Sequence, residues 1–279
     1  MQLRRDHADY PEALRDLDRP PDPVWARGNL DLLLRPCVAI VGTRRATPYA
    51  ERVTRELART VARAGACVIS GLARGVDAEA HRGALEVGGA TCAVLGTGLD
   101  VVYPKGHALL QQHIGERGLL LSELQPTNAA HGGSFPERNR IIAALARVTI
   151  VVEAGFKSGA LITARVANEL GRTVAAVPGP IDIPQAQGSN ELLRDGATMI
   201  ACMADALALL GLTAPVRLVD LPEGGAERRM WDALGEGAAD LDTLCTRSAL
   251  PAHLAMAGVT GLEMRGLVEC ALSGEIRRA

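Results

Sequence analysis

The sequence predicts an α/β protein built on a doubly wound, mostly parallel sheet, with a smaller helical domain after it. Short apolar runs such as CVAIVG, ACVISG and VTIVVE recur between residues 36 and 200, bounded by Gly, Ser or Pro. Such runs are typical of parallel strands that are buried on both faces. Segments with amphipathic helical spacing lie between them and end at glycine, as at residues 46–65. This alternation of strand and helix favours one open sheet covered by helices on both faces.

The composition divides the chain into four segments. Residues 1–35 are charged and rich in proline, and we expect an N-terminal arm packed on the core, anchored by Trp25. Residues 36–212 hold the predicted sheet domain. Residues 213–225 are rich in Pro and Gly and are typical of a linker. Residues 226–279 offer three short helices and a terminal hairpin, an order that fits a winged-helix domain.

Composition and charge exclude several classes of protein. The 279 residues carry a formal net charge of −2, so any nucleic-acid site has to be local. The six cysteines are scattered without a CxxC pair or metal-ligand spacing, which favours reduced thiols and no metal site. The N-terminus lacks the apolar region of an export signal, and no apolar run approaches the roughly 18 residues of a membrane span. We therefore expect a cytoplasmic protein without membrane insertion.

Cationic side chains follow several of the predicted strands. Ligands of an open parallel sheet bind beyond the carboxyl ends of the strands. The motifs GTRR, LARG and FKSG occupy that position, and GGSFPERNR opens the helix that precedes VTIVVE. Both phenylalanines of the chain lie in these motifs, whose Gly and Ser residues can present N–H groups to anions at helix N-termini. The rim predicted from these motifs carries six cations, namely Arg44, Arg45, Arg74, Arg138, Arg140 and Lys157.

The pattern favours an extended phosphodiester as the ligand of this rim. GxGxxG is absent after the first strand, GTGLDV after the third strand offers two of three glycines, and GxxxxGK[ST] does not occur. Cations on successive loops with aromatic rings beside them suit a nucleic-acid strand better than a compact triphosphate. The alternative is that the arginines are solvated or paired with Glu51, Glu56, Asp77 and Glu137, and charge placement alone does not separate the two.

No set of residues indicates catalysis. Asp77 and His81 lie four residues apart and are expected to be a helix N-cap and a packing or hydrogen-bonding residue. Ser70 ends a strand but lacks the GxSxG turn of a hydrolase, and no second carboxylate is fixed near Glu153. The expected groove helix of the C-terminal domain, PAHLAMAGVTGL, contains no Lys or Arg, so groove binding by it is not expected. We predict no catalytic residues, no metal and no cofactor.

Seven motifs of the predicted sheet domain occur in a distinctive order: VAIVGTRRATPYA, VISGLARGVDAEAHRGAL, AVLGTGLDVVYP, LLSELQP, GSFPERNRIIAAL, SGALITARVANELGRTVAAVPG and GSNELLRDGA. Over residues 10–210 they resemble the bacterial DNA-processing protein A (DprA, also called Smf) family, and the tail is similar to the winged-helix domain of many members. The resemblance implies a Rossmann-like fold that forms a homodimer and binds single-stranded DNA with little sequence preference. It also implies delivery of that DNA to the recombinase RecA during natural transformation, with displacement of single-strand-binding protein and without catalysis.

The resemblance implies a set of DNA-binding positions on the rim, which are assigned here by matching each motif of the family to this sequence. Phe135 would be a stacking surface, and Arg138 and Arg140 would be phosphate clamps, unless one of the two faces inward to hold the loop. Some relatives have a lysine just ahead of their GSF motif, where this chain has Gly132 and Gly133, so Arg138 or Lys157 would have to replace that contact. The complete set is Gly42, Thr43, Arg44, Arg45, Ser70, Gly71, Arg74, Phe135, Arg138, Asn139, Arg140, Lys157, Ser158 and Gly159.

Two alternatives to a single-stranded DNA-binding recombination mediator stay open. The first is a nucleotide-processing enzyme of the lysine-decarboxylase-like (phosphoribohydrolase) type, whose PGGxGTxxE motif has only VPGPID and EAGFKSGALITA as counterparts here. The second is a scaffold whose winged-helix domain binds a protein partner. For the expected homodimer, the apolar residues near 192–200 are the candidate subunit contact.

Overall fold

The computed structural model describes residues 1–213, 224–271 and 274–278. They fall into two compact units, Met1–Pro215 and Val216–Ala279. Most of the predicted linker, residues 214–223, lies outside the described residues. Each unit is therefore described by itself.

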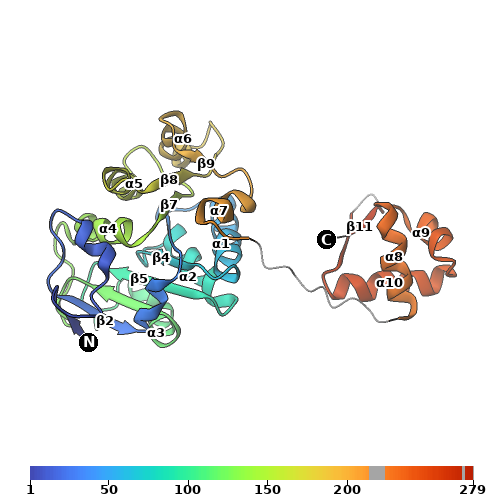
Figure 1. Ribbon diagram of the computed structural model, residues 1–279. Coiled ribbons are helices and arrows are strands. Elements are labelled where there is room, and N and C mark those ends of the chain that lie inside the picture. Colours follow the sequence, from blue (N-terminus) through green and yellow to red (C-terminus); the bar gives the residue numbers. More distant parts are fainter. Residues whose placement is uncertain (214–223, 272–273, 279) are drawn as a thin grey trace. The chain divides into compact units, whose positions relative to one another are not determined.

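A nine-stranded sheet runs through the larger unit in the order β1-β2-β6-β5-β4-β3-β7-β8-β9 (Figure 1). The strands from β6 to β9 in this order are parallel, which confirms the predicted fold class. Seven apolar runs of the sequence form strands, and all of them except the exposed two-residue edge strand β9 contain buried residues. The seven are β3 (Cys37–Val41), β4 (Cys67–Ser70), β5 (Ala90–Leu95), β6 (Leu119–Ser122), β7 (Val148–Val151), β8 (Thr173–Ala176) and β9 (Thr198–Met199).

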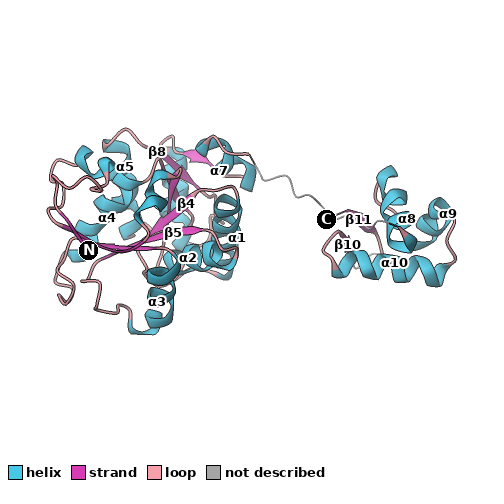
Figure 2. Cartoon of the chain, turned by 60° about the horizontal axis from the view of Figure 1, so that its bottom comes forward, coloured by secondary structure: helices cyan, strands magenta, loops and turns pink. Residues whose placement is uncertain are grey.

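Helices cover both faces of this sheet (Figure 2). One face packs against α1 (Pro48–Arg63), α2 (Val76–Glu86), α3 (Ala108–Arg117) and α7 (Met203–Leu210). The other face packs against α4 (Ser134–Leu145), α5 (Gly159–Glu169) and α6 (Gln187–Arg194). Alternate residues of β3 divide between the two layers, since Val38 and Ile40 face the first and Ala39 and Val41 face the second.

The N-terminal segment extends the sheet, whereas the sequence predicted an arm packed on the core. It forms β1 (Gln2–Leu3) and β2 (Val24–Gly28), and two short 3₁₀ helices, Glu12–Asp16 and Leu30–Leu34. Strand β2 runs antiparallel to β6, with Trp25 opposite Ser122. Because β6 is fully buried, its outer edge needs a covering strand, and β2 provides it. Trp25 packs against the apolar cluster beneath α3, as the predicted anchor would.

The order of the parallel strands reverses between β3 and β7. The chain proceeds from β3 through β4 and β5 to β6 on one side, and from β7 to β8 and β9 on the other. β3 and β7 pair directly, with Val41 opposite Val151. The loops that follow these two strands diverge to opposite faces of the sheet, so a crevice opens at their carboxyl ends.

The smaller unit contains α8 (Gly225–Ala233), α9 (Leu241–Ser248) and α10 (Ala252–Met264), followed by β10 (Val268–Cys270) and β11 (Ile276–Arg278). β10 and β11 form an antiparallel hairpin. Met230, Leu244 and Leu262 are fully buried between the helices. Three helices and a hairpin in this order agree with the predicted winged-helix arrangement. In neither unit do the described residues include a helix that is long and apolar enough to cross a membrane.

Candidate nucleic-acid interface

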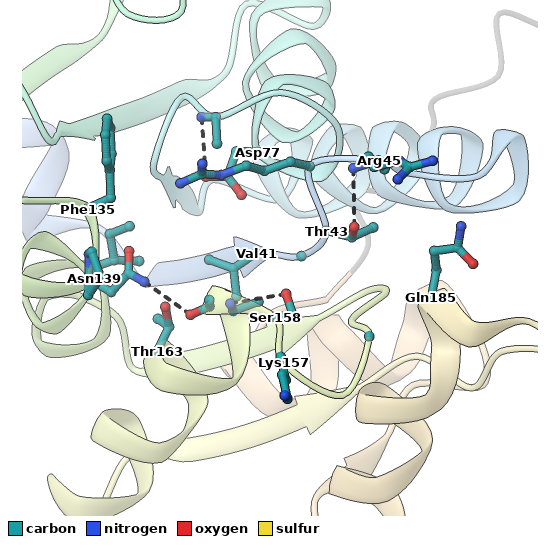
Figure 3. Close-up of a pocket in the computed structure, with 18 of the residues that line it drawn as sticks. Val41, Thr43, Arg45, Asp77, Phe135, Asn139, Lys157, Ser158, Thr163 and Gln185 are labelled. Carbon is teal, nitrogen blue, oxygen red and sulfur yellow. Dashed lines mark hydrogen bonds between the residues drawn. The ribbon is translucent and has the colours of Figure 1, made fainter. Parts of the chain in front are cut away.

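A pocket of about 560 Å³ lies at the point where the strand order reverses (Figure 3). The loops after β3 and β7 line it, together with the first turns of α4 and α5. Pro184 and Gln185, from the segment between β8 and α6, close one side. The predicted rim therefore exists, and its residues surround a concave site.

The loop after β3 is held by a buried carboxylate. Glu153 is 3% exposed and accepts hydrogen bonds from the Thr47 N–H (2.9 Å) and the Thr47 hydroxyl (2.7 Å). The Thr43 N–H donates to the Glu153 backbone carbonyl at 2.7 Å. With both ends fixed, Arg44 and Arg45 are exposed at the tip of this loop. Glu153 is thus engaged in positioning two of the predicted cations.

Arg138 lies inside the protein, which corrects its predicted role as a phosphate clamp. Its side chain is 4% exposed and donates to the backbone carbonyls of Gly71, at 2.7 Å, and Val94. The buried Asp77 beside it accepts from the N–H groups of Gly71 (3.1 Å) and Ala73 (3.4 Å). Burial lowers the pKa of Arg138 to about 10, so the guanidinium stays charged at neutral pH. Arg138 therefore holds the ends of β4 and β5 together.

Unlike Arg138, which lines the pocket from its buried position, Arg140 and Ser70 do not line it. Arg140 is half-buried outside the pocket, where it forms an ion pair with Glu123. The Ser70 hydroxyl is fully buried and donates to the Ile40 carbonyl at 2.7 Å, linking two strands. As the last residue of β4, Ser70 points into the sheet layers instead of the crevice.

Phe135 is held in place from three directions. Its ring stacks on Tyr103, with centroids 4.9 Å apart and planes inclined by 37°. The Arg44 guanidinium lies over the ring, 5.3 Å from its centroid. Below it, a Cβ added to Gly96 would lie only 2.6 Å from the ring Cδ1, so only glycine leaves room for it. Sequence reasoning did not single out Tyr103, although the YP that ends AVLGTGLDVVYP follows a predicted strand and was the available signal.

The loop after β7 completes the site. Phe156 and Lys157 are exposed, and Ser158 caps α5 by accepting from the Ala160 N–H at 3.3 Å. The Asn139 side chain donates to the Gly159 carbonyl at 3.1 Å, which joins the second turn of α4 to the start of α5 (Figure 3). Asn139 is therefore a bridge between the two helices that line the pocket.

The pocket is electropositive because its one acid is already neutralised. The opposite charges of Arg138 and Asp77 offset each other in the interior. The exposed cations of the lining are then Arg44, Arg45 and Lys157. None of these three forms an ion pair within the described parts of the chain. An anion in the pocket would meet uncompensated charge and the N-terminus of α5.

The structure brings most of the predicted positions together. Gly71 and Arg74 line a smaller pocket on the other side of Phe135, and Ser70 and Arg140 lie outside both. The predicted positions that line the main pocket are Gly42, Thr43, Arg44, Arg45, Phe135, Arg138, Asn139, Lys157, Ser158 and Gly159. Pro184, Gln185 and Thr163 also line it and were not predicted, since no motif or charge distinguishes them.

Asp77 and His81 do not form a catalytic pair. The prediction of Asp77 as an N-cap is wrong, because α2 begins after Gly75 and the Asp77 carboxylate binds the preceding loop. His81 is fully buried, with Nδ1 2.7 Å from the Thr91 hydroxyl, as expected of a hydrogen-bonding core residue. Burial, helped by nearby positive charge, lowers its pKa to about 3. Across the described residues, no group of three or more His, Cys, Asp or Glu is placed to hold a metal ion.

The fold and the site define a Rossmann-like α/β protein with a cationic, aromatic-lined pocket at the strand-order reversal. Residues 2–211 match the family model of DNA recombination-mediator protein A, and residues 220–273 match the DprA winged helix domain. The chain belongs to the DNA recombination-mediator protein A (DprA/Smf) family.

Relatives match along most of the chain. A putative DNA processing protein DprA of Mycobacterium tuberculosis is 40% identical over 258 residues, which cover 88% of this chain and 66% of the relative. The DprA structure from Streptococcus pneumoniae has a TM-score of 0.72 at 40% identity, covering 75% of this chain and 73% of that one. A structure of the DprA of Helicobacter pylori, which describes a single-stranded DNA binding mode, has a TM-score of 0.67 at 37% identity. The match covers 72% of this chain and 93% of that one. The chain thus spans just under two thirds of the length of the mycobacterial relative.

Proposed function

We propose that this protein is a recombination mediator that binds single-stranded DNA along the rim of the larger unit, within residues 36–212. The observation that carries the proposal is the Arg44–Phe135–Tyr103 stack beside the exposed cations Arg45 and Lys157. Aromatic rings that stack bases, combined with cations that follow a backbone, bind single strands with little sequence preference. The family of the chain and the single-stranded DNA binding of the Helicobacter relative support the same ligand.

A binding titration at two salt concentrations tests the proposal. Charge reversal in Arg45→Glu should weaken binding to a single-stranded oligonucleotide strongly, and the effect should shrink as salt rises. Arg165→Glu is the matched control, since Arg165 is exposed on α5 outside the pocket and the two variants change the net charge equally. Equal losses in both variants would show that only overall charge matters and would remove the rim as the site.

The winged-helix unit (residues 226–279) is proposed to have a separate role. Its helix α10 presents no Lys or Arg, so it has little electrostatic drive toward DNA. The described residues of this unit form an apolar core of their own, with Met230, Leu244 and Leu262 fully buried in it. Deleting residues 226–279 should therefore spare oligonucleotide binding, and a folded truncation that no longer bound would relocate the DNA site.

The downstream steps are proposed from the family. We infer that the protein acts in the cytoplasm as a homodimer, without catalysis, and loads the recombinase RecA onto DNA covered by single-strand-binding protein during natural transformation. DNA-dependent ATP hydrolysis by RecA on covered single strands should accelerate in its presence and not with Arg45→Glu.

A contact for the proposed homodimer can be tested on the edge strand β9. Of the apolar residues near 192–200, Leu192 and Leu193 pack on the core and Ile200 is buried, whereas Met199 is exposed. Met199→Arg should shift the sedimentation coefficient toward a monomer if this edge forms the contact. An unchanged coefficient would place the contact elsewhere.

A further inference from the structure

We propose that Phe156 is a second base-stacking surface, at the opposite end of the rim from Phe135, so that the site recognises a strand of several nucleotides and not a single one. The inference rests on the proposed binding of single-stranded DNA. It adds to that function a residue outside the predicted set of DNA-binding positions.

Phe156 is 64% exposed, although it is one of only two phenylalanines in the chain. A single exposed apolar side chain on a surface needs no explanation by itself. This one, however, lines the electropositive pocket directly beside Lys157. Its ring takes part in no aromatic pair or cation–π contact within the described residues, so most of the ring is available to stack on a base.

The two rings are attached at well-separated places on the sheet. The Phe135 ring packs on Gly96, directly after β5, whereas Phe156 lies in the loop after β7. Strands β4 and β3 lie between β5 and β7 in the sheet. Three strand spacings of about 4.8 Å separate the two attachment points, which is roughly 14 Å. A stacked strand rises about 3.4 Å per nucleotide, so this span corresponds to about four nucleotides of one strand.

The pocket that both rings line also carries cations for a sugar-phosphate backbone. Arg45 lies in the loop after β3, and Lys157 adjoins Phe156. The labelled side chains in Figure 3 show Phe135, Arg45 and Lys157 arriving from three separate elements around the pocket. The Asn139–Gly159 hydrogen bond ties α4, which carries Phe135 in its first turn, to α5, which follows Phe156. The elements that carry the two stacking surfaces are therefore tied together, and exposed cations line the same pocket.

The test compares ligand length in the full chain. Phe156→Ala should weaken binding of an oligothymidylate of about 12 nucleotides by roughly 5- to 150-fold, the loss expected for one stacked base. It should leave binding of a thymidine dinucleotide unchanged, because a dinucleotide is held at the Phe135 end. Phe135→Ala should weaken both ligands. Leu109→Ala is the matched control, since Leu109 is equally exposed and apolar but lies on α3 outside the pocket.

Two further readouts separate stacking from a general loss of structure. Phe156→Trp should retain the affinity, and the slope of log affinity against log salt should not change in Phe156→Ala because no phosphate contact is lost. A 2-aminopurine base moved along the oligonucleotide should be quenched at two separate positions, and Phe156→Ala should remove one of them. If the unmodified protein binds the oligonucleotide and Phe156→Ala binds it equally well, this inference is wrong while the proposed function stands. If the unmodified protein binds no single strand, the proposed function itself fails.

Discussion

Replacing Arg138 by methionine should destabilise the larger unit by about 3 kcal/mol. The variant keeps the apolar volume but leaves the Asp77 carboxylate buried without its cation, and the Gly71 and Val94 carbonyls without their donor. Leaving a buried charge without a compensating opposite charge costs roughly 3–5 kcal/mol. Asp77 still accepts from two backbone N–H groups, which places the expected cost at the lower end of this range.

Urea unfolding measures this cost. Trp25 lies in the larger unit and Trp231 in the smaller one, so a Trp231→Phe background makes fluorescence report on the larger unit alone. The control is Arg140→Met, two residues along the same helix, where a partly exposed ion pair should cost less than about 1 kcal/mol. Similar losses in the two variants would refute the structural role of Arg138.

The same variant also separates a structural arginine from a phosphate contact. Arg138→Met should weaken oligonucleotide binding through displaced loops while the salt slope stays constant. Arg45→Ala should reduce that slope by about 0.7, the value for one phosphate contact on a single strand. Adding Asp77→Asn to Arg138→Met should restore part of the stability, because the isolated charge disappears. A reduced salt slope in Arg138→Met would mean that Arg138 contacts phosphate after all.

Three further outcomes follow from buried contacts. Gly96→Ala should displace the Phe135 ring and weaken oligonucleotide binding about tenfold, since stacking contributes about 1–3 kcal/mol per base. Fluorescence anisotropy measures this affinity. Gly106→Ala is the control and should bind normally, because a Cβ there meets nothing within 4 Å. Ser70→Ala should lower the free energy of unfolding by about 1 kcal/mol and leave DNA affinity unchanged, and a large binding defect would contradict its burial. His81 has a pKa of about 3 when folded and about 6.5 when unfolded, so the unfolded state takes up the proton and stability falls as pH drops from 6.5, by up to about 1.4 kcal/mol per unit. Urea unfolding at neutral and mildly acidic pH checks this. Between these two pH values, the free energy of unfolding should fall less in His81→Gln than in the unmodified protein.

The parallel strands and the rim could be predicted because they depend on patterns that local sequence carries. Fully apolar runs such as CVAIV can only be central parallel strands, and the carboxyl ends of those strands must share one edge. The N-terminal strands could not be predicted in the same way. β1 has only two residues, and β2 follows a proline-rich stretch. The strand that pairs with β2, β6, lies almost a hundred residues away in the sequence.

The individual roles of the rim residues depend on tertiary contacts. Arg138 and Arg140 are two positions apart in α4, so helical geometry places them on different faces without saying which faces inward. The carbonyl groups at the ends of β4 and β5 decide that Arg138 is the buried one. Tyr103 contacts Phe135 from a loop, where no periodicity indicates its direction.

The antiparallel pairing of β2 with β6 also sets an order of events during synthesis. Residues 24–28 are made early, yet their partners at 119–122 leave the ribosome only after β3, β4 and β5 have been made. Long-range pairing of this kind cannot form until the intervening chain is present. β2 can pair with β1 as soon as both have been made, but its other edge has to wait without a partner until β6 emerges.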